Sequence, residues 1–201
     1  MSLAPPKITC LFFTDPSLPA FLHTPAGRAL AGDLLVECSP HPALGYVLNL
    51  ETPANYPGVA GLLGGVDHGT LAHPTDALPA PILLAPGAPV SALALRAALV
   101  RLLRPDDRLH TVTLLVPVGD ARLFGAALAL ADRFAVAWDA AAFPHDDLLD
   151  FARWLAAEKL LTAGNFAGLF AYVTTPPAAA HAQRLAGLLA PFGTRLLTIS
   201  P

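Results

Sequence analysis

Short apolar runs alternate with Ala- and Leu-rich segments from about residue 80 to the end of the chain. The apolar runs predict strands at residues 81–85, 109–116, 134–138, 169–173 and 195–199. The segments between them predict helices at about 89–103, 120–132, 145–162 and 177–191. Strands that alternate with helices indicate a parallel sheet, because parallel neighbours need crossover connections. The strands show little apolar/polar alternation, which is typical of a sheet covered on both faces.

The N-terminal part of the chain has a less regular pattern. Residues 8–14 predict a strand, and residues 18–30 predict a helix that is broken at Pro25 and Gly27. Two further strands are predicted at residues 34–38 and 45–50. The segment between these two is too short for a helical crossover, so we expect an antiparallel pair at the sheet edge.

Residues 52–79 are rich in Gly, Pro, His and Thr and have no clear period. They predict a long irregular loop, a kind of segment that is uncommon in compact domains and is often functional.

These elements predict a single α/β domain over residues 1–201. The expected fold is a three-layer sandwich with a mostly parallel sheet, Rossmann-like or flavodoxin-like, with extra N-terminal strands at an edge. The periodicity does not indicate which parallel strands are neighbours.

The composition describes an easily buried core and a charge-poor surface. Hydrophobic residues make up 54% of the chain and charged residues 13%, against about 25% charged residues in an average domain. Such a surface favours burial in a homo-oligomer. The net charge is −3, and the basic residues form no dense positive face, which excludes nucleic acid as the main partner.

Two charge-free stretches, residues 77–95 and 160–183, are long enough to cross a bilayer. Prolines and glycines interrupt both, so we expect no transmembrane helix and no membrane partner. No secretory signal pattern is present. Cys10 and Cys38 lie in predicted strands, where buried free thiols are the simplest interpretation and a bridge between neighbouring strands is the alternative. These observations favour a cytoplasmic protein.

In open parallel sheets, ligands bind outside the carboxyl ends of the strands, where the strand order reverses. Backbone amides and hydroxyl groups there hold phosphate or carboxylate without a basic side chain. The ligand-binding candidates chosen by this rule are Asp15, Ser17, Gly87, Gly119, Asp120, Asp139, Thr174 and Thr175. The competing interpretation is that these residues form ordinary caps and turns.

The specific motifs of several enzyme classes are missing. The glycines of residues 58–65 are not followed by the Gly-Lys-Ser/Thr of a P-loop, and no lysine lies between Lys7 and Lys159. A flexible or tightly turned loop is therefore the favoured interpretation of this run. There is no Gly-x-Ser-x-Gly elbow, kinase motif set, CxxC pair or EF-hand loop. The sequence leaves open which cofactor the protein uses, if any, and whether the protein is an enzyme.

Two weaker hypotheses concern histidines. His68 and His73 supply metal-binding nitrogens, but their spacing is loose, and a third ligand such as His41 or Asp15 would have to join them. Histidines with local hydrogen bonds at the surface are the favoured interpretation. Cys38 and His41 are placed for a thiolate pair, but a buried strand cysteine followed by a turn is favoured.

The leading functional hypothesis is a small-molecule-binding protein that holds a phosphorylated or nucleotide-like ligand at the carboxyl edge of the sheet. The alternative is a non-catalytic, dimeric interaction or scaffold domain, which the lack of every specific catalytic motif favours. The two hypotheses differ in whether the native protein binds a small molecule at all.

Overall fold

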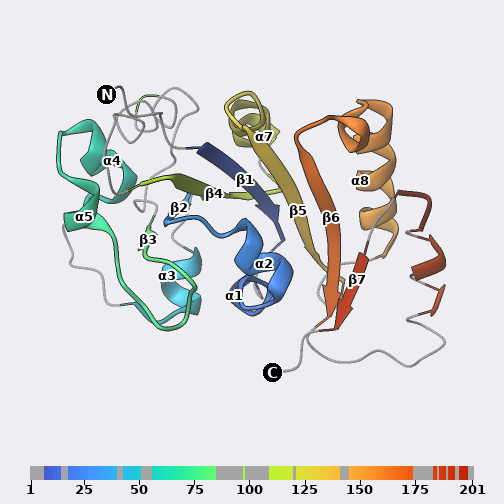
Figure 1. Cartoon of the computed structure of the whole chain (residues 1–201), viewed down its shortest axis with the longest axis horizontal. Coiled ribbons are helices and arrows are strands. Elements are labelled where there is room, and N and C mark those ends of the chain that lie inside the picture. Colours follow the sequence, from blue (N-terminus) through green and yellow to red (C-terminus); the bar gives the residue numbers. More distant parts are fainter. Residues whose placement is uncertain are drawn as a thin grey trace.

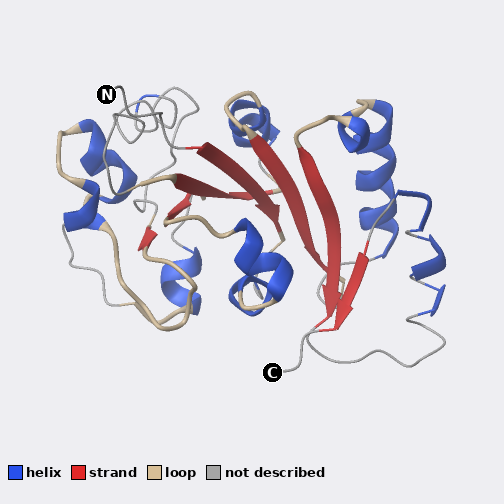
Figure 2. Cartoon of the chain, viewed as in Figure 1, coloured by secondary structure: helices blue, strands red, loops and turns tan. Residues whose placement is uncertain are grey.

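The computed structural model describes residues 7–14, 18–39, 43–50, 56–84, 97, 109–119, 121–140, 145–173, 183–184, 186–188, 190–192 and 195–198. Figures 1 and 2 show these residues as a central sheet with helices packed around it.

All strands of the sheet are parallel, which confirms the predicted fold class. The sheet has seven strands in the order β3-β2-β4-β1-β5-β6-β7. They are β1 (Lys7–Phe13), β2 (Leu34–Glu37), β3 (Ile82–Leu83), β4 (Thr111–Pro117), β5 (Arg133–Asp139), β6 (Phe166–Val173) and β7 (Arg195–Thr198). Five of them correspond to the five strands predicted after residue 80.

Strand β1 shows why the fold has three layers. Leu11 and Phe13 belong to one buried cluster, Cys10 and Phe12 belong to the other, and all four are fully buried. The first cluster includes residues of α1 (Leu18–Leu22), α2 (Pro25–Leu30) and α3 (Ala43–Val47). The second includes residues of α4 (Gly58–Leu63), α5 (His68–Leu71), α7 (Ala121–Leu128) and α8 (His145–Ala157). Both faces of the sheet are therefore covered.

The strand predicted at residues 45–50 is wrong, because this segment begins with helix α3 and continues as a turn. The antiparallel edge pair is wrong for the same reason, since β2 lies inside the sheet and pairs in parallel with β3 and β4. A side-chain contact supports the helix: Glu37 Oε1 accepts a hydrogen bond from the Leu44 amide at 2.9 Å. This bond satisfies one of the amides that a helix start leaves without a partner.

Residues 52–79 are more regular than the sequence indicates. Helices α4 and α5 lie in this segment, and His73 forms an isolated antiparallel bridge with Ile82. Gly58 and Gly65 flank most of α4 with φ angles of 50° and 89°, values that glycine adopts readily and other residues rarely do. The interpretation of residues 58–65 as a loop is wrong over Gly58–Leu63, which form α4, and a turn follows at Gly64 and Gly65.

The helix boundaries refine the predictions in two places. Pro25 begins α2 instead of breaking a longer helix, and Thr24 Oγ1 accepts the Gly27 amide at 3.0 Å as the cap. Helix α8 ends at Ala157, and Lys159 adopts a left-handed φ of 59° before the short 3-10 helix η1 (Leu160–Thr162). A second 3-10 helix, η2, spans Ala190–Phe192.

The helices predicted at 89–103 and 177–191 fall largely outside the described residues. Within the part of the chain that is described, no helix has both the length and the apolar character needed to cross a membrane.

Candidate functional site

At the carboxyl edge of the sheet, the connections that follow β1 and β5 run in opposite directions. After β1 the chain forms α1 on one face of the sheet and continues toward β2. After β5 it forms α8 on the opposite face and continues toward β6. Because β1 and β5 are neighbours, their connections diverge at this point. This is the geometry at which open α/β sheets bind ligands.

Two polar residues meet where β1 and β5 end. Thr14 follows β1, and Asp139 is the last residue of β5. The Asp139 amide donates a hydrogen bond to Thr14 Oγ1 at 2.8 Å, and the Thr14 amide donates to the Ala137 carbonyl at 3.2 Å. Both residues are only 3% exposed. The structure therefore ties the Thr14 hydroxyl to the backbone of Asp139 where β1 and β5 end.

Gly119 lies at the same edge, after β4. The preceding residue, Val118, donates its amide hydrogen bond to the Phe13 carbonyl at 3.0 Å, which fastens the end of β4 to the end of β1. Gly119 is exposed, and a Cβ atom added to it would meet no atom within 4 Å. The space beside Gly119 is thus open.

Of the residues chosen from the sequence, the structure places Gly119 after the end of β4 and Asp139 at the end of β5. These are the two strands that flank β1. The remaining candidates lie outside the described residues: Asp15, Ser17, Gly87, Asp120, Thr174 and Thr175. Thr14 follows β1 directly and belongs to the strand-end segment of residues 14–17, which the rule for strand ends selects from the sequence together with Asp15 and Ser17.

Another polar group at this edge was not predicted from the sequence. Glu37, the last residue of β2, is fully buried. Tyr56 donates its hydroxyl hydrogen bond to the Leu71 carbonyl at 2.9 Å and accepts one from the Leu84 amide at 3.2 Å. Burial raises the pKa of Tyr56, the bond from Leu84 lowers it, and the Glu37 carboxylate raises it, with a net upward shift. The phenol therefore stays protonated at neutral pH and ties α5 to β3.

The cysteines are buried free thiols, as expected. Strand β4 lies between β1 and β2, so the alternative of a bridge between neighbouring strands is wrong. Burial, and to a smaller extent Asp132, raises the pKa of Cys10 to about 12. Burial raises the pKa of Cys38 well above its ordinary value, with smaller contributions from Cys10 and Glu37. A protonated, buried Cys38 is not a nucleophile, and its suggested partner His41 lies outside the described residues.

The histidine pair is not brought together with further metal ligands in the described part of the chain. His68 begins α5, and the His73 ring packs against Tyr56 with a centroid separation of 4.9 Å. Among the described residues, no three His, Cys, Asp or Glu side chains gather as a metal-binding group would.

No protein-family model and no curated protein matches the chain. Solved structures match its fold. The MinC:MinD cell division protein complex of Aquifex aeolicus matches with a TM-score of 0.65 and 14% identity, over 97% of this chain and 82% of that chain. Cobyrinic acid a,c-diamide synthase of Mycobacterium smegmatis with bound ADP and magnesium gives a TM-score of 0.61 and 19% identity, over 92% of this chain and 81% of that chain.

A plasmid partition protein of Borrelia burgdorferi bound to AMPPNP also matches, with a TM-score of 0.60 and 15% identity, over 98% of this chain and 87% of that chain. At these identities the likeness establishes the α/β fold alone. Two of the three similar structures hold an adenine nucleotide or its analogue.

Proposed function

We propose that this protein binds a nucleotide-like ligand in the crevice between β1 and β5 and does not hydrolyse it. The observation that carries the proposal is the meeting of Thr14 and Asp139 at the point where the strand connections diverge. The fold likeness supports it, because similar structures contain ADP with magnesium or AMPPNP.

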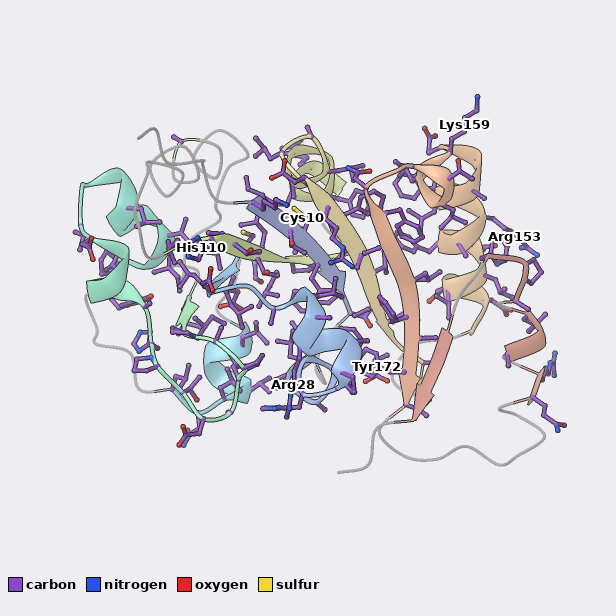
Figure 3. The ribbon with its side chains drawn as sticks, viewed as in Figure 1. Cys10, Arg28, His110, Arg153, Lys159 and Tyr172 are labelled. Atoms are coloured by element: carbon purple, nitrogen blue, oxygen red, sulfur yellow. The ribbon has the colours of Figure 1, made fainter. Side chains whose placement is uncertain are left out.

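The lack of hydrolysis follows from the positions of the lysines. A P-loop ends in Gly-Lys-Ser/Thr, and its lysine contacts the β- and γ-phosphates that the reaction separates. This chain has only Lys7 and Lys159. Lys7 begins β1 and Lys159 follows the C-terminal end of α8, so both belong to the end of the sheet opposite the crevice. Figure 3 shows Lys159 pointing away from the protein. Neither lysine is placed to contact phosphates at the carboxyl edge.

Replacing Gly119 with valine is expected to abolish nucleotide binding without unfolding the protein. The new side chain would project into open space at the crevice edge, where it meets no protein atom within 4 Å of its Cβ, and it would take up room that the ligand needs. The measurement is the thermal-unfolding midpoint with and without ADP and magnesium. At 100 times the dissociation constant, binding adds about 2.7 kcal/mol of stability, which the variant should lack.

Gly164→Val is the matched control, because the Cβ of residue 164 also meets nothing within 4 Å and the residue precedes β6, at the opposite edge. The control should keep the full response to ADP. If the original protein does not respond, or if Gly119→Val responds as strongly as the control, the proposal is wrong. Release of phosphate from ATP at an enzymatic rate would contradict the absence of hydrolysis.

A groove between α7 and α8 favours a second candidate function, that of a dimeric interaction domain. Its volume is about 400 Å³, and its lining includes Phe124, Phe151, Trp154 and Leu160. Trp154 is 42% exposed, and its ring lies 5.4 Å from Phe124 and 5.7 Å from Phe151. Aromatic residues are enriched at the centres of protein interfaces.

The proposed occupant of this groove is a second copy of the chain. Only 13% of the residues are charged, so a large part of the surface favours burial. Glu158 lines the groove, and the oppositely charged Lys159 follows it in sequence. A twofold interface brings a patch onto its own copy, so Glu158 of one copy would pair with Lys159 of the other if the axis passes close to both.

Replacing Trp154 with serine is therefore expected to convert a dimer into a monomer. Light scattering during size-exclusion chromatography measures the mass of each form. Val66→Ser is the control, since Val66 is similarly exposed, at 40%, and lies outside the groove. A monomeric original protein, or a dimer that survives Trp154→Ser, would remove this candidate.

A further inference from the structure

A cavity of about 620 Å³ lies at the amino edge of the sheet, opposite the proposed nucleotide site. The starts of β1, β4, β5 and β6 and the end of α2 enclose it. Its polar lining residues are Lys7, Thr9, Thr111, Asp132, Arg133 and Asn165. The volume is within the range of about 300–1,000 Å³ that is typical of small-molecule sites.

The charges of this cavity favour an anion. Lys7 and Arg133 both line it and are exposed to solvent. Neither forms an ion pair with another residue in the described part of the chain. Asp132 Oδ2 already accepts a hydrogen bond from the Ile8 amide at 2.8 Å. The cavity thus offers two cations that form no ion pair with the described residues and one carboxylate that is held by the backbone.

A local irregularity of the sheet shapes the wall of the cavity. Phe134 pairs with Phe166 and Ala135 pairs with Gly168, so Ala167 is left out of register between β5 and β6. Gly168 has a φ of 146°, and Ala167 lines the cavity. Bulges of this kind interrupt strand pairing and occur frequently beside binding sites. Here the bulge forms part of the wall of the amino-edge cavity.

We infer that the amino-edge cavity binds a small organic acid, with its carboxylate or phosphate group between Lys7 and Arg133. Two donors with positive charge suit such a group, and hydrogen bonds to charged partners are stronger than neutral ones. Both cations are exposed, so salt screens the attraction and weakens binding. This inference is independent of the proposed nucleotide site, because the two sites lie at opposite ends of the strands.

The test uses succinate and ribose 5-phosphate as probes, with uncharged ribose as the control compound. Calorimetric titration of the full chain should detect at least one acid and no ribose, and the response should weaken as salt is added. Arg133→Gln should weaken acid binding by about two- to fivefold, because it removes one of the two cations and exposed ion pairs are weak. Comparing the two acids shows whether carboxylate or phosphate is the preferred group.

Gly164→Val should block the cavity, because Gly164 lines it and has open space at its Cβ position. Gly119→Val is the matched control and should bind the acid normally. Should Gly164→Val fail to fold, Lys7→Gln serves as the second variant, because its side chain is exposed. Failure of both acids to bind, or binding that Arg133→Gln leaves unchanged, overturns the inference. If Gly119→Val abolishes acid binding and Gly164→Val does not, the acid binds at the carboxyl edge, and this result overturns the inference as well.

Discussion

Replacing Phe12 with alanine is expected to lower the free energy of unfolding by about 3–5 kcal/mol, the range measured for buried Phe-to-Ala changes. Phe12 is fully buried in β1, a central strand of the sheet. Its ring stacks on Phe124 of α7 at 3.9 Å and meets the edge of Phe134 in β5 at 6.4 Å. The alanine variant loses both contacts and leaves a cavity between the sheet and α7. A domain is stable by only about 5–15 kcal/mol in total.

Urea denaturation of the two proteins measures this difference. Val47→Ala is a control that also truncates an apolar side chain, but Val47 lies in α3 and is 48% exposed. Surface substitutions of this kind usually change stability by no more than about 0.5 kcal/mol. A loss for Phe12→Ala that is as small as the control's would show that the ring does not pack between β5 and α7.

The strand and helix alternation after residue 80 could be predicted because it depends on local patterns. Strand β5 is an example: its buried run from Phe134 to Trp138 is apolar throughout, as both-face burial requires. The segment that begins α3 could not be assigned in this way. It is short, and its helix start is satisfied by Glu37, a residue of the preceding strand. No local pattern encodes that contact.

The candidate site was only partly predictable for a similar reason. The rule for strand ends selected Gly119 and Asp139 from the sequence. The bond between Thr14 and the Asp139 amide joins residues 125 positions apart. It depends on β1 and β5 being neighbours, and the sequence pattern does not give the strand order. The amino-edge cavity was missed because the same rule directs attention only to the carboxyl edge.

Replacing Gly27 with alanine is expected to destabilise the protein by about 3 kcal/mol, near the upper end of the usual range for overpacking. A Cβ atom on Gly27 would lie 2.1 Å from the Phe21 carbonyl oxygen and 2.6 Å from Leu22 Cα. Both are backbone atoms of α1, so no side-chain rotation relieves the clash. Since Phe21 stacks on Tyr172 of β6 at 5.3 Å, α1 moves away from α2 only by disturbing the core beneath it.

Gly125→Ala is the matched control for this change. Gly125 lies within helix α7, and an added Cβ meets nothing within 4 Å. Alanine is favoured over glycine inside a helix by about 1 kcal/mol, so this control should be more stable than the original protein. The two glycine-to-alanine changes should thus shift the urea midpoint in opposite directions. If both raise it, α1 and α2 are not packed backbone to backbone as the close approach at Gly27 requires.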